Sequence, residues 1–226
     1  RKKIWSLSWP LIIANFTIPL VGLTDTVIMG HMPNSLYLAA IAIGGIIFNF
    51  MYAGLNFLRM GTTGIVAQKL GANNLEEVFF SLLRPLLIAF SIGISLFLLK
   101  NYLYDLSVYF LTPNQEIQAL YKEYFFVRML GLPAGLLNIV FLGWFFGMQK
   151  TKSVMLQLII INLVNVISSL YLAVYLDYGI YGVALGSVLA QVSGLFLSII
   201  IFINYFKILN LNLFNLKKLL NLNGFI

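Results

Sequence analysis

The chain has 226 residues, of which 61% are hydrophobic and only 9% are charged. A soluble globular domain carries about 25% charged residues, so this composition excludes one and predicts an integral membrane protein. The sequence has no cysteine and a single histidine, which excludes disulfides, thiol nucleophiles and multi-histidine metal sites. The net charge of +7 is spread over short connections and chain ends, so it does not indicate a surface that binds nucleic acid.

Six apolar segments each meet the length of about 20 residues that a bilayer-spanning helix needs. They predict an all-α, polytopic membrane protein with six transmembrane helices, at roughly 7–30, 36–68, 79–100, 119–148, 153–176 and 180–205. The connections are short, except that 101–118 is expected to be a longer loop because it contains Asp105, Pro113 and Glu116. Residues 1–206 would form one transmembrane lobe, and 207–226 a cytoplasmic linker or an amphipathic surface segment.

The basic residues predict how the lobe is oriented. With a cytoplasmic N-terminus, nine lysines and arginines lie on the cytoplasmic side, and only Lys100 and Lys122 lie on the other. The positive-inside rule therefore places both termini in the cytoplasm. Small residues spaced three or four apart are expected to bring helices close together, and three such pairs occur, namely Gly61 with Gly64, Gly143 with Gly147, and Gly182 with Gly186.

The first apolar segment carries a carboxylate, Asp25, within a stretch long enough to span the membrane. A charged side chain at this depth costs at least about 2.5–3.5 kcal/mol, so such residues usually face a polar interior and have a function. Burial disfavours the charged form of a carboxyl group, which makes Asp25 a candidate protonation switch. The alternative is an acid at a helix end that reaches the outer interface, since His31 follows one to two turns later.

The same segment contains two prolines, Pro10 and Pro19, and two further polar residues, Asn15 and Thr17. Each proline removes a backbone donor and permits a bend where neighbouring helices satisfy the freed carbonyl. We expect Pro10 and Pro19 to bend the helix, and Asn15 and Thr17 to face a cavity together with the acid.

Two arginines, Arg59 and Arg128, are further candidates for charges at membrane depth. Folding the first two segments about residue 33 leaves Arg59 eighteen residues, or about 27 Å, deeper than Asp25, which excludes direct pairing. Arg59 is expected near the cytoplasmic headgroups or at a polar cluster of Thr62, Thr63 and Gln68. Arg128 lies at a depth comparable to that of Asp25 and could pair with it, although Glu123 is an equally accessible partner.

Polar residues on the last two segments have two interpretations. Asn165, Ser168 and Ser169 lie on the fifth segment, and Ser187 and Gln191 on the sixth. Each taken singly predicts an interhelical hydrogen bond of about 0.6 kcal/mol, whereas as a set they could line a polar cavity that faces the first helix. No phosphate-binding loop, nucleophile elbow or zinc-protease motif occurs, so the sequence does not indicate an enzyme.

Three stretches, taken in order, carry a resemblance that covers nearly the whole chain: WPLIIANFTIPLVGLTDTVIMGH, FLRMGTTGIVAQKLGANN and RMLGLPAGLLNIVFLGWFFGMQ. Together they resemble the multidrug and toxic compound extrusion (MATE) family, specifically its DinF-like branch. The resemblance implies twelve helices in two six-helix lobes, of which this chain is the amino-terminal one, with the second lobe missing here. It also implies export of organic cationic or amphipathic compounds, driven by inward flow of H⁺ or Na⁺.

The family's functional positions fall on residues of this chain. The coupling aspartate of the first helix falls on Asp25, and the bending proline on Pro10. The asparagine of the fifth helix falls on Asn165, and a hydroxyl of the sixth on Ser187. Where many relatives have a second aspartate this chain has Ser169, which weakens a Na⁺ site and favours H⁺ as the coupling ion, with no metal or other cofactor.

Two other functions fit a six-helix membrane lobe. One is a lipid-linked oligosaccharide flippase of the wider superfamily, which we expect to have more cationic residues lining its cavity. The other is a non-transporting membrane scaffold subunit, which would need no buried acid. A rocking transporter needs two repeats, so we expect a fragment of a longer transporter of the inner (plasma) membrane.

Overall fold

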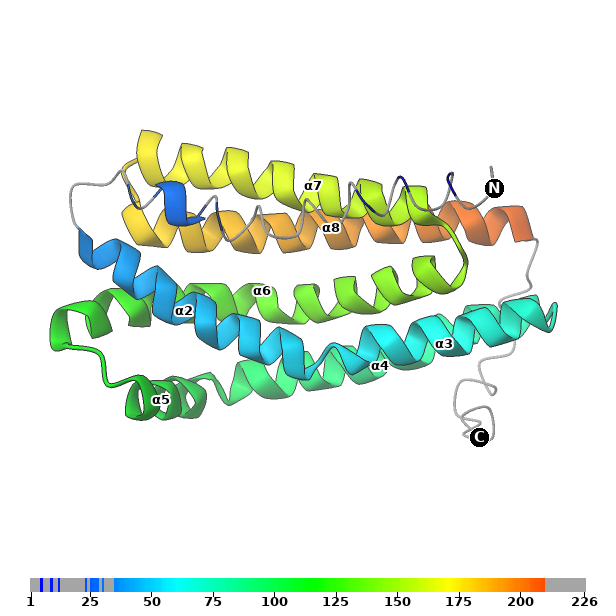
Figure 1. Ribbon diagram of the computed structural model, residues 1–226, viewed down its shortest axis with the longest axis horizontal. Coiled ribbons are helices and arrows are strands. Elements are labelled where there is room, and N and C mark those ends of the chain that lie inside the picture. The colour runs from blue at the N-terminus through cyan, green and yellow to red at the C-terminus, as the bar shows by residue number, and fades with distance from the viewer. Residues whose placement is uncertain are drawn as a thin grey trace.

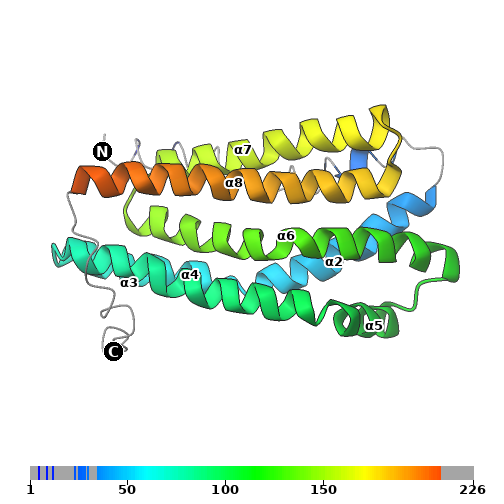
Figure 2. The ribbon, with the colours of Figure 1, turned by 180° about the vertical axis from the view of Figure 1, so that it is seen from behind.

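The described residues of this computed structural model are 35–209, together with Trp5, Trp9, Ile12, Leu23, 25–28 and Gly30. They form helices joined by short turns, and no strand occurs among them. In chain order the helices are α2 (Ser35–Gly54), α3 (Phe57–Gly71), α4 (Leu75–Leu98), α5 (Lys100–Leu111), α6 (Gln115–Gly147), α7 (Thr151–Ser169), the π-helix η1 (Leu170–Tyr175) and α8 (Gly179–Leu209). α7 and α8 lie together on one side of α6, and α2, α3 and α4 lie on the other (Figures 1 and 2).

Five helical stretches of the described chain are long and apolar enough to cross a membrane. Their bounds are Ser35–Gly71, Leu75–Leu98, Gln115–Gly147, Thr151–Tyr175 and Gly179–Tyr205. They correspond to the second to sixth predicted segments, and the all-α membrane architecture is confirmed. Most of the first predicted segment, 7–30, and the end of the chain after residue 209 lie outside the described residues.

The predicted loop at 101–118 is wrong, because most of it is the helix α5. Polar residues interrupt the apolar run there, and the prediction equated this interruption with the end of helical structure. A helix that does not span the membrane needs no long apolar run, so α5 can form despite these residues. α5 is held by its buried residues: the Ser107 and Tyr121 hydroxyls are 2.6 Å apart, and the Tyr104 ring stacks on that of Tyr121 at 5.5 Å. The helix ends where Thr112 adopts a left-handed conformation (φ 41°) directly before Pro113.

α6 is the central helix of the lobe. A larger share of its apolar stretch is buried than in the other four spans, as expected of a helix that is hydrophobic on all sides. Its first turn is capped by Asn114, whose Oδ1 accepts a hydrogen bond from the Ile117 backbone N–H at 2.9 Å. Near its other end, the indole of Trp144 donates to the backbone carbonyl of Val78 on α4 at 3.0 Å. Side chains on α6 can therefore meet partners from both sides of the bundle.

Two of the three glycine pairs hold helices together. A Cβ added at Gly143 would lie 2.6 Å from the carbonyl oxygen of Arg59, and Gly147 is packed equally closely against α3. Within the described part of the chain, by contrast, Gly61 and Gly64 have no atom within 4 Å of an added Cβ. Close packing was therefore predicted correctly for the pair on α6 and wrongly for the pair on α3.

The glycine pair on α8 positions the end of α7. A Cβ at Gly182 would lie 2.6 Å from the backbone N of Ala173, and one at Gly186 would lie 2.7 Å from the backbone N of Ser169. The α-helix changes to the π-helix η1 immediately after Ser169, and such irregular turns are frequent near functional sites. This close approach brings the polar residues of α7 and α8 next to each other.

Candidate functional site

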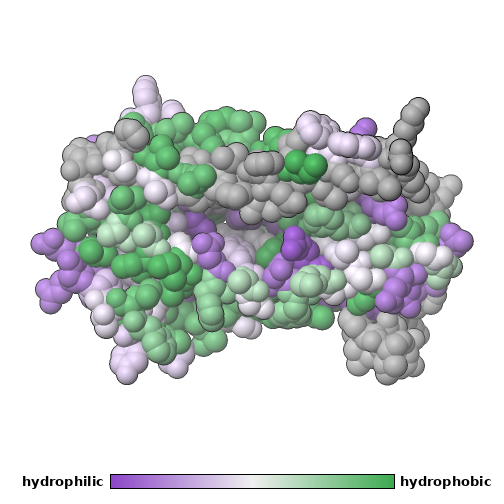
Figure 3. All heavy atoms as spheres, viewed as in Figure 1, coloured by the Kyte–Doolittle hydropathy of each residue, from purple (hydrophilic) through white to green (hydrophobic). Residues whose placement is uncertain are grey.

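A cavity of about 850 Å³ lies inside the bundle. Residues of α2, α6 and α7 line most of it, together with residues of the first segment, of α3 and of α8. Figure 3 shows a hollow on one face, with hydrophilic atoms around it and hydrophobic surface on either side. Apolar side chains such as Ile41, Phe48 and Leu158 line much of it. The polar and charged side chains of the lining are Asp25, Thr26, Asn49, Tyr52, Asn56, Arg59, Tyr124, Arg128, Asn138, Asn162 and Gln191. A largely apolar cavity with a few polar groups is the usual form of a small-molecule site.

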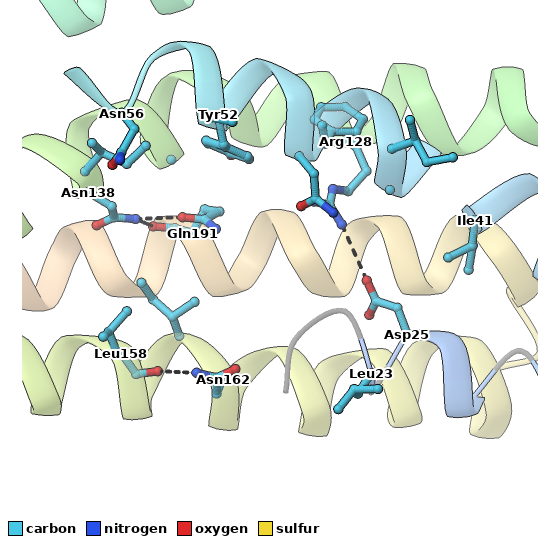
Figure 4. Close-up of a pocket in the computed structure, with 18 of the residues that line it drawn as sticks. Leu23, Asp25, Ile41, Tyr52, Asn56, Arg128, Asn138, Leu158, Asn162 and Gln191 are labelled. Carbon is cyan, nitrogen blue, oxygen red and sulfur yellow. Dashed lines mark hydrogen bonds and ion pairs between the residues drawn. The ribbon is translucent and has the colours of Figure 1, made fainter. Parts of the chain in front are cut away.

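Asp25 lies at one end of this cavity and is almost completely buried, with 2% of its surface exposed. Its Oδ2 accepts hydrogen bonds from Arg128 Nη1 at 3.4 Å and from Ser187 Oγ at 3.3 Å (Figure 4). Its Oδ1 has no hydrogen-bond partner among the described residues. The carboxylate therefore faces the interior of the bundle, and the alternative of an acid that reaches the outer interface does not fit this structure.

Arg128 connects the acid to the aromatic side of the cavity. Besides Asp25, its Nη1 donates to the Tyr124 hydroxyl at 2.8 Å and to Ser187 Oγ at 3.0 Å. Its Cζ lies 4.9 Å from the centre of the Phe48 ring, a distance typical of a cation–π contact. Glu123, the alternative partner, is exposed on α6. Arg128 is thus the cation that neutralises the ionised form of Asp25.

Ser187 and Asn165 join the charged pair to the last two helices. The Ser187 hydroxyl donates to Asp25 and accepts from Arg128 and, at 3.1 Å, from Asn165 Nδ2, which uses its one hydrogen and both lone pairs. Asn165 Nδ2 also lies 3.5 Å from Ser169 Oγ. Asn165, Ser169 and Ser187 are all buried. These three predicted residues converge on Asp25, whereas Asn15, Thr17, Pro10 and Pro19 lie outside the described residues.

A second cluster of polar residues consists of side-chain amides. Among its members, only Gln191 was identified from the sequence. Asn138 Nδ2 donates to the backbone oxygen of Gln191 at 2.8 Å and to its Oε1 at 2.9 Å (Figure 4). Gln157 Nε2 in turn donates to Asn138 Oδ1 at 3.1 Å. Asn138 lies in the middle of a long apolar segment, and a polar residue there is costly to insert. That cost was the available signal, and it applies to Gln157 and Asn162 as well.

Arg59 does not form the polar cluster expected of it. The Thr62 hydroxyl donates to the Leu58 carbonyl at 2.6 Å, and the Thr63 hydroxyl donates to the carbonyls of Arg59 and Gly143. Both threonines thus satisfy backbone groups and not the guanidinium. Arg59 instead lines the same cavity as Asp25. No group of three or more potential metal ligands among His, Cys, Asp and Glu occurs in the described part of the chain.

The family model MatE matches residues 10–171, which is more than half of the chain. The chain belongs to the MatE family. It is 33% identical over 199 residues to DNA damage-inducible protein F of Escherichia coli (strain K12), covering 88% of this chain and 43% of that protein. It is 26% identical over 155 residues to the probable multidrug resistance protein NorM of Bacillus subtilis (strain 168), covering 69% and 34%. This MatE chain therefore spans less than half the length of these relatives.

Solved structures of MATE proteins share the fold. A MATE crystal structure in the straight conformation superposes with a TM-score of 0.82 at 22% identity, covering 93% of this chain and 47% of that one. An outward-facing multidrug resistance MATE family transporter gives 0.78 at 23% identity, covering 88% and 44%. MatE family members are transporters and not enzymes. In these relatives two lobes form one protein, and the MatE chain described here corresponds to one lobe.

Proposed function

We propose that this chain is the amino-terminal lobe of a secondary transporter that exports organic cationic or amphipathic compounds in exchange for protons. The observation that carries the proposal is a single buried carboxylate, Asp25, at the end of a cavity large enough for a small organic molecule. The relatives named multidrug resistance proteins support export of such compounds. The second lobe, which relatives carry in the same protein, would complete the cavity.

The proposed switch is the contact between the first segment and the helices α6 and α8. When Asp25 is ionised, Arg128 of α6 and Ser187 of α8 hold its Oδ2, which ties the first segment to both helices. When a proton binds, the carboxyl group loses the charge that attracts Arg128, while Arg128 keeps its hydrogen bond to Tyr124. The two protonation states thus differ in the contacts that hold the first segment. Such a difference in interaction is what a bound proton needs to shift a conformational equilibrium.

Protons are the proposed coupling ion because Asp25 is the only acidic residue that lines the cavity within the described chain. Ser169, where the family resemblance implies a second aspartate in many relatives, is fully buried and packed against Gly186. One carboxylate that is already paired with Arg128 offers little net negative charge to a sodium ion. Proton exchange needs only the carboxyl group itself.

In the proposed orientation the lobe lies in the plasma membrane and both termini lie in the cytoplasm. Lys69, Lys150 and Lys152 follow or precede turns at the end of the bundle where α8 also ends (Figures 1 and 2). Lys100 and Lys122 lie at the opposite end, near α5. This arrangement supports the positive-inside prediction.

Neither alternative function is favoured by a specific observation. The described lining holds two cationic side chains, Arg59 and Arg128, fewer than we expect of a lipid-linked oligosaccharide flippase. A scaffold subunit would have no use for a buried acid that is tied to two other helices. We therefore retain proton-coupled export.

The test is export by the full-length protein in proteoliposomes with an imposed pH gradient, measured with a panel of fluorescent organic compounds. Asp25→Asn should abolish gradient-driven export while the protein still inserts and purifies as a single species. Asp177→Asn is the matched control, because Asp177 is exposed between η1 and α8 at φ 56°, a conformation that asparagine tolerates. Normal pH-driven export by Asp25→Asn would refute the proposal, and export by residues 1–226 alone would refute the requirement for a second lobe.

A further inference from the structure

The charges that line the cavity do not balance. Its ionisable lining consists of one acid, Asp25, and two guanidinium groups, those of Arg59 and Arg128. Arg128 is paired with Asp25, whereas Arg59 forms no ion pair with any carboxylate in the described part of the chain. The remainder of the first segment contains no other charged side chain. This lobe therefore presents a net positive charge to whatever enters the cavity.

Arg59 lies far from the proton site. Asp25 contacts α6 at Arg128, whereas the backbone of Arg59 is packed against α6 at Gly143. These two positions are fifteen residues apart, which corresponds to about 22 Å along a helix. Arg59 is also ten residues, or about 15 Å, from Lys69 at the end of α3, which is half the thickness of a hydrocarbon core. A cation held at this depth without a carboxylate partner is expected to have a function.

The backbone of Arg59 is packed against α6, and the residue lines the cavity. The absence of a side chain at Gly143 allows the Arg59 carbonyl to approach α6, and the Thr63 hydroxyl donates to that carbonyl at 2.8 Å. The guanidinium Cζ lies 6.0 Å from the centre of the Phe146 ring, at the limit of a cation–π contact. The side chain is only partly buried. Its hydrogen-bond donors can therefore reach a molecule in the cavity.

Two side-chain amides, those of Asn56 and Gln191, line the same cavity as Arg59 and add hydrogen-bond donors to it. Asn56 lies in the turn between α2 and α3, one helical turn before Arg59, and lines the same cavity. Gln191 accepts a hydrogen bond from Asn138 through its Oε1, which fixes which side of the amide is NH₂ and directs that group away from Asn138. A planar guanidinium accompanied by amide N–H groups matches the oxygen atoms of a carboxylate.

We propose that Arg59, with the amides of Asn56 and Gln191, binds the acidic group of the transported compound, so that the substrates of this lobe are amphipathic carboxylates. This inference rests on the proposed function and selects one of its two substrate classes. The apolar body of the compound would lie along the apolar lining between Arg59 and the Asp25–Arg128 pair. A purely cationic compound would be repelled by the unpaired guanidinium. Because the two sites are separated by about 22 Å along α6, proton binding at Asp25 acts through the first segment and not through direct contact with the substrate.

The test measures equilibrium binding to the full-length protein in phosphatidylcholine nanodiscs, without any pH gradient. The probes are three radiolabelled compounds with one apolar body: 4-(2-naphthyl)butanoate, its neutral amide, and the corresponding trimethylammonium compound. Empty nanodiscs give the background from lipid partitioning. The variants are Arg59→Gln, which removes the charge, and Arg59→Lys, which keeps it. Lys152→Gln is the control, because it removes a cation that is exposed at the start of α7, outside the cavity.

The wild-type protein should bind the carboxylate more tightly than the ammonium compound. Arg59→Gln should weaken carboxylate binding by about tenfold or more, as expected for the loss of a hydrogen bond between charged groups, and should change amide binding less than twofold. Arg59→Lys should restore much of the affinity, and Lys152→Gln should have no effect. The proposal is overturned if the wild type does not bind the carboxylate, if it prefers the ammonium compound, or if Arg59→Gln weakens all three probes equally. If the protein does not bind the carboxylate as predicted, pH-driven export of other compounds would still be expected. If pH-driven export is absent, the predicted differences in carboxylate binding would still be expected.

Discussion

Replacing Gly143 on α6 with alanine should destabilise the lobe, whereas the same replacement at Gly61 on α3 should not. The new methyl group at Gly143 would lie 2.6 Å from the Arg59 carbonyl oxygen, and ordinary van der Waals contact begins at 3.4 Å. α3 and α6 would have to move about 0.8 Å apart to accommodate it. The obstructing atom belongs to the backbone, so no side chain can turn aside to relieve the contact.

The expected loss of stability follows from two opposing effects. Overpacking usually costs about 1–3 kcal/mol, and contact with backbone atoms places Gly143→Ala near the upper value. Alanine gains about 1 kcal/mol over glycine in helix propensity, which leaves a net loss of about 2 kcal/mol. At Gly61 an added Cβ meets no atom of the described chain within 4 Å, so the gain in helix propensity outweighs any cost of packing there.

The assay is the apparent melting temperature of the full-length protein in detergent. It is measured as the fraction of protein that remains monodisperse after heating. A net loss of about 2 kcal/mol corresponds to a decrease of about 2–4 °C for a two-lobe protein about twice the length of this chain. Gly61→Ala should leave the temperature unchanged or raise it slightly. Equal decreases for both variants, or an unchanged temperature for Gly143→Ala, would refute the reasoning about close approach of α3 and α6.

Three further results are expected. Ser187→Ala should reduce pH-driven export and destabilise the lobe by about 1–3 kcal/mol, because it removes the hydroxyl that donates to Asp25 and accepts from Asn165. Ser193→Ala on the same helix should do neither, because that hydroxyl donates only to the carbonyl of Ala190, and export rates and melting temperatures would reveal the difference. Arg128→Gln should lower thermal stability by at most about 3–5 kcal/mol at neutral pH, and by less in acid, where a protonated carboxyl needs no cation; an effect independent of pH would contradict the ion pair. Single cysteines at Ser35 and Asn73, labelled in intact cells with an impermeant reagent, should react at Ser35 only, and the reverse pattern would overturn the orientation.

The apolar lengths predicted the membrane spans well because bilayer thickness limits them directly. The prediction failed at 101–118 because it treated a break in the apolar run as a break in the helix. Asp105 and other polar residues remove α5 from the membrane-spanning class, yet Tyr104 and Ser107 still bury one side of it against α6. A break in the apolar run and a break in the helix have different causes. Here the helix itself ends only at Thr112 and Pro113.

The candidate site was predictable as a set of costly residues but not as a geometry. Asp25, Asn165 and Ser187 were identified because polar groups in apolar segments need a partner or a function. That Arg128 pairs with Asp25 and not with Glu123 depends on how the helices are rotated. Depth along the chain does not reveal this rotation. The same holds for the glycines: Gly61 and Gly143 sit in similar patterns, and only the position of α3 against α6 distinguishes them.

The measurement that tests the central claim most directly is proton release during substrate binding. The full-length protein in weakly buffered detergent would be mixed with the compound that shows the largest pH-driven export, and the pH change followed with an indicator dye. Export in exchange for protons requires that the substrate and the proton at Asp25 exclude each other, so binding to the wild type should release protons. Asp25→Asn should bind the compound without releasing any. Equal proton release by the wild type and by Asp25→Asn would show that another group exchanges the proton and would contradict the account.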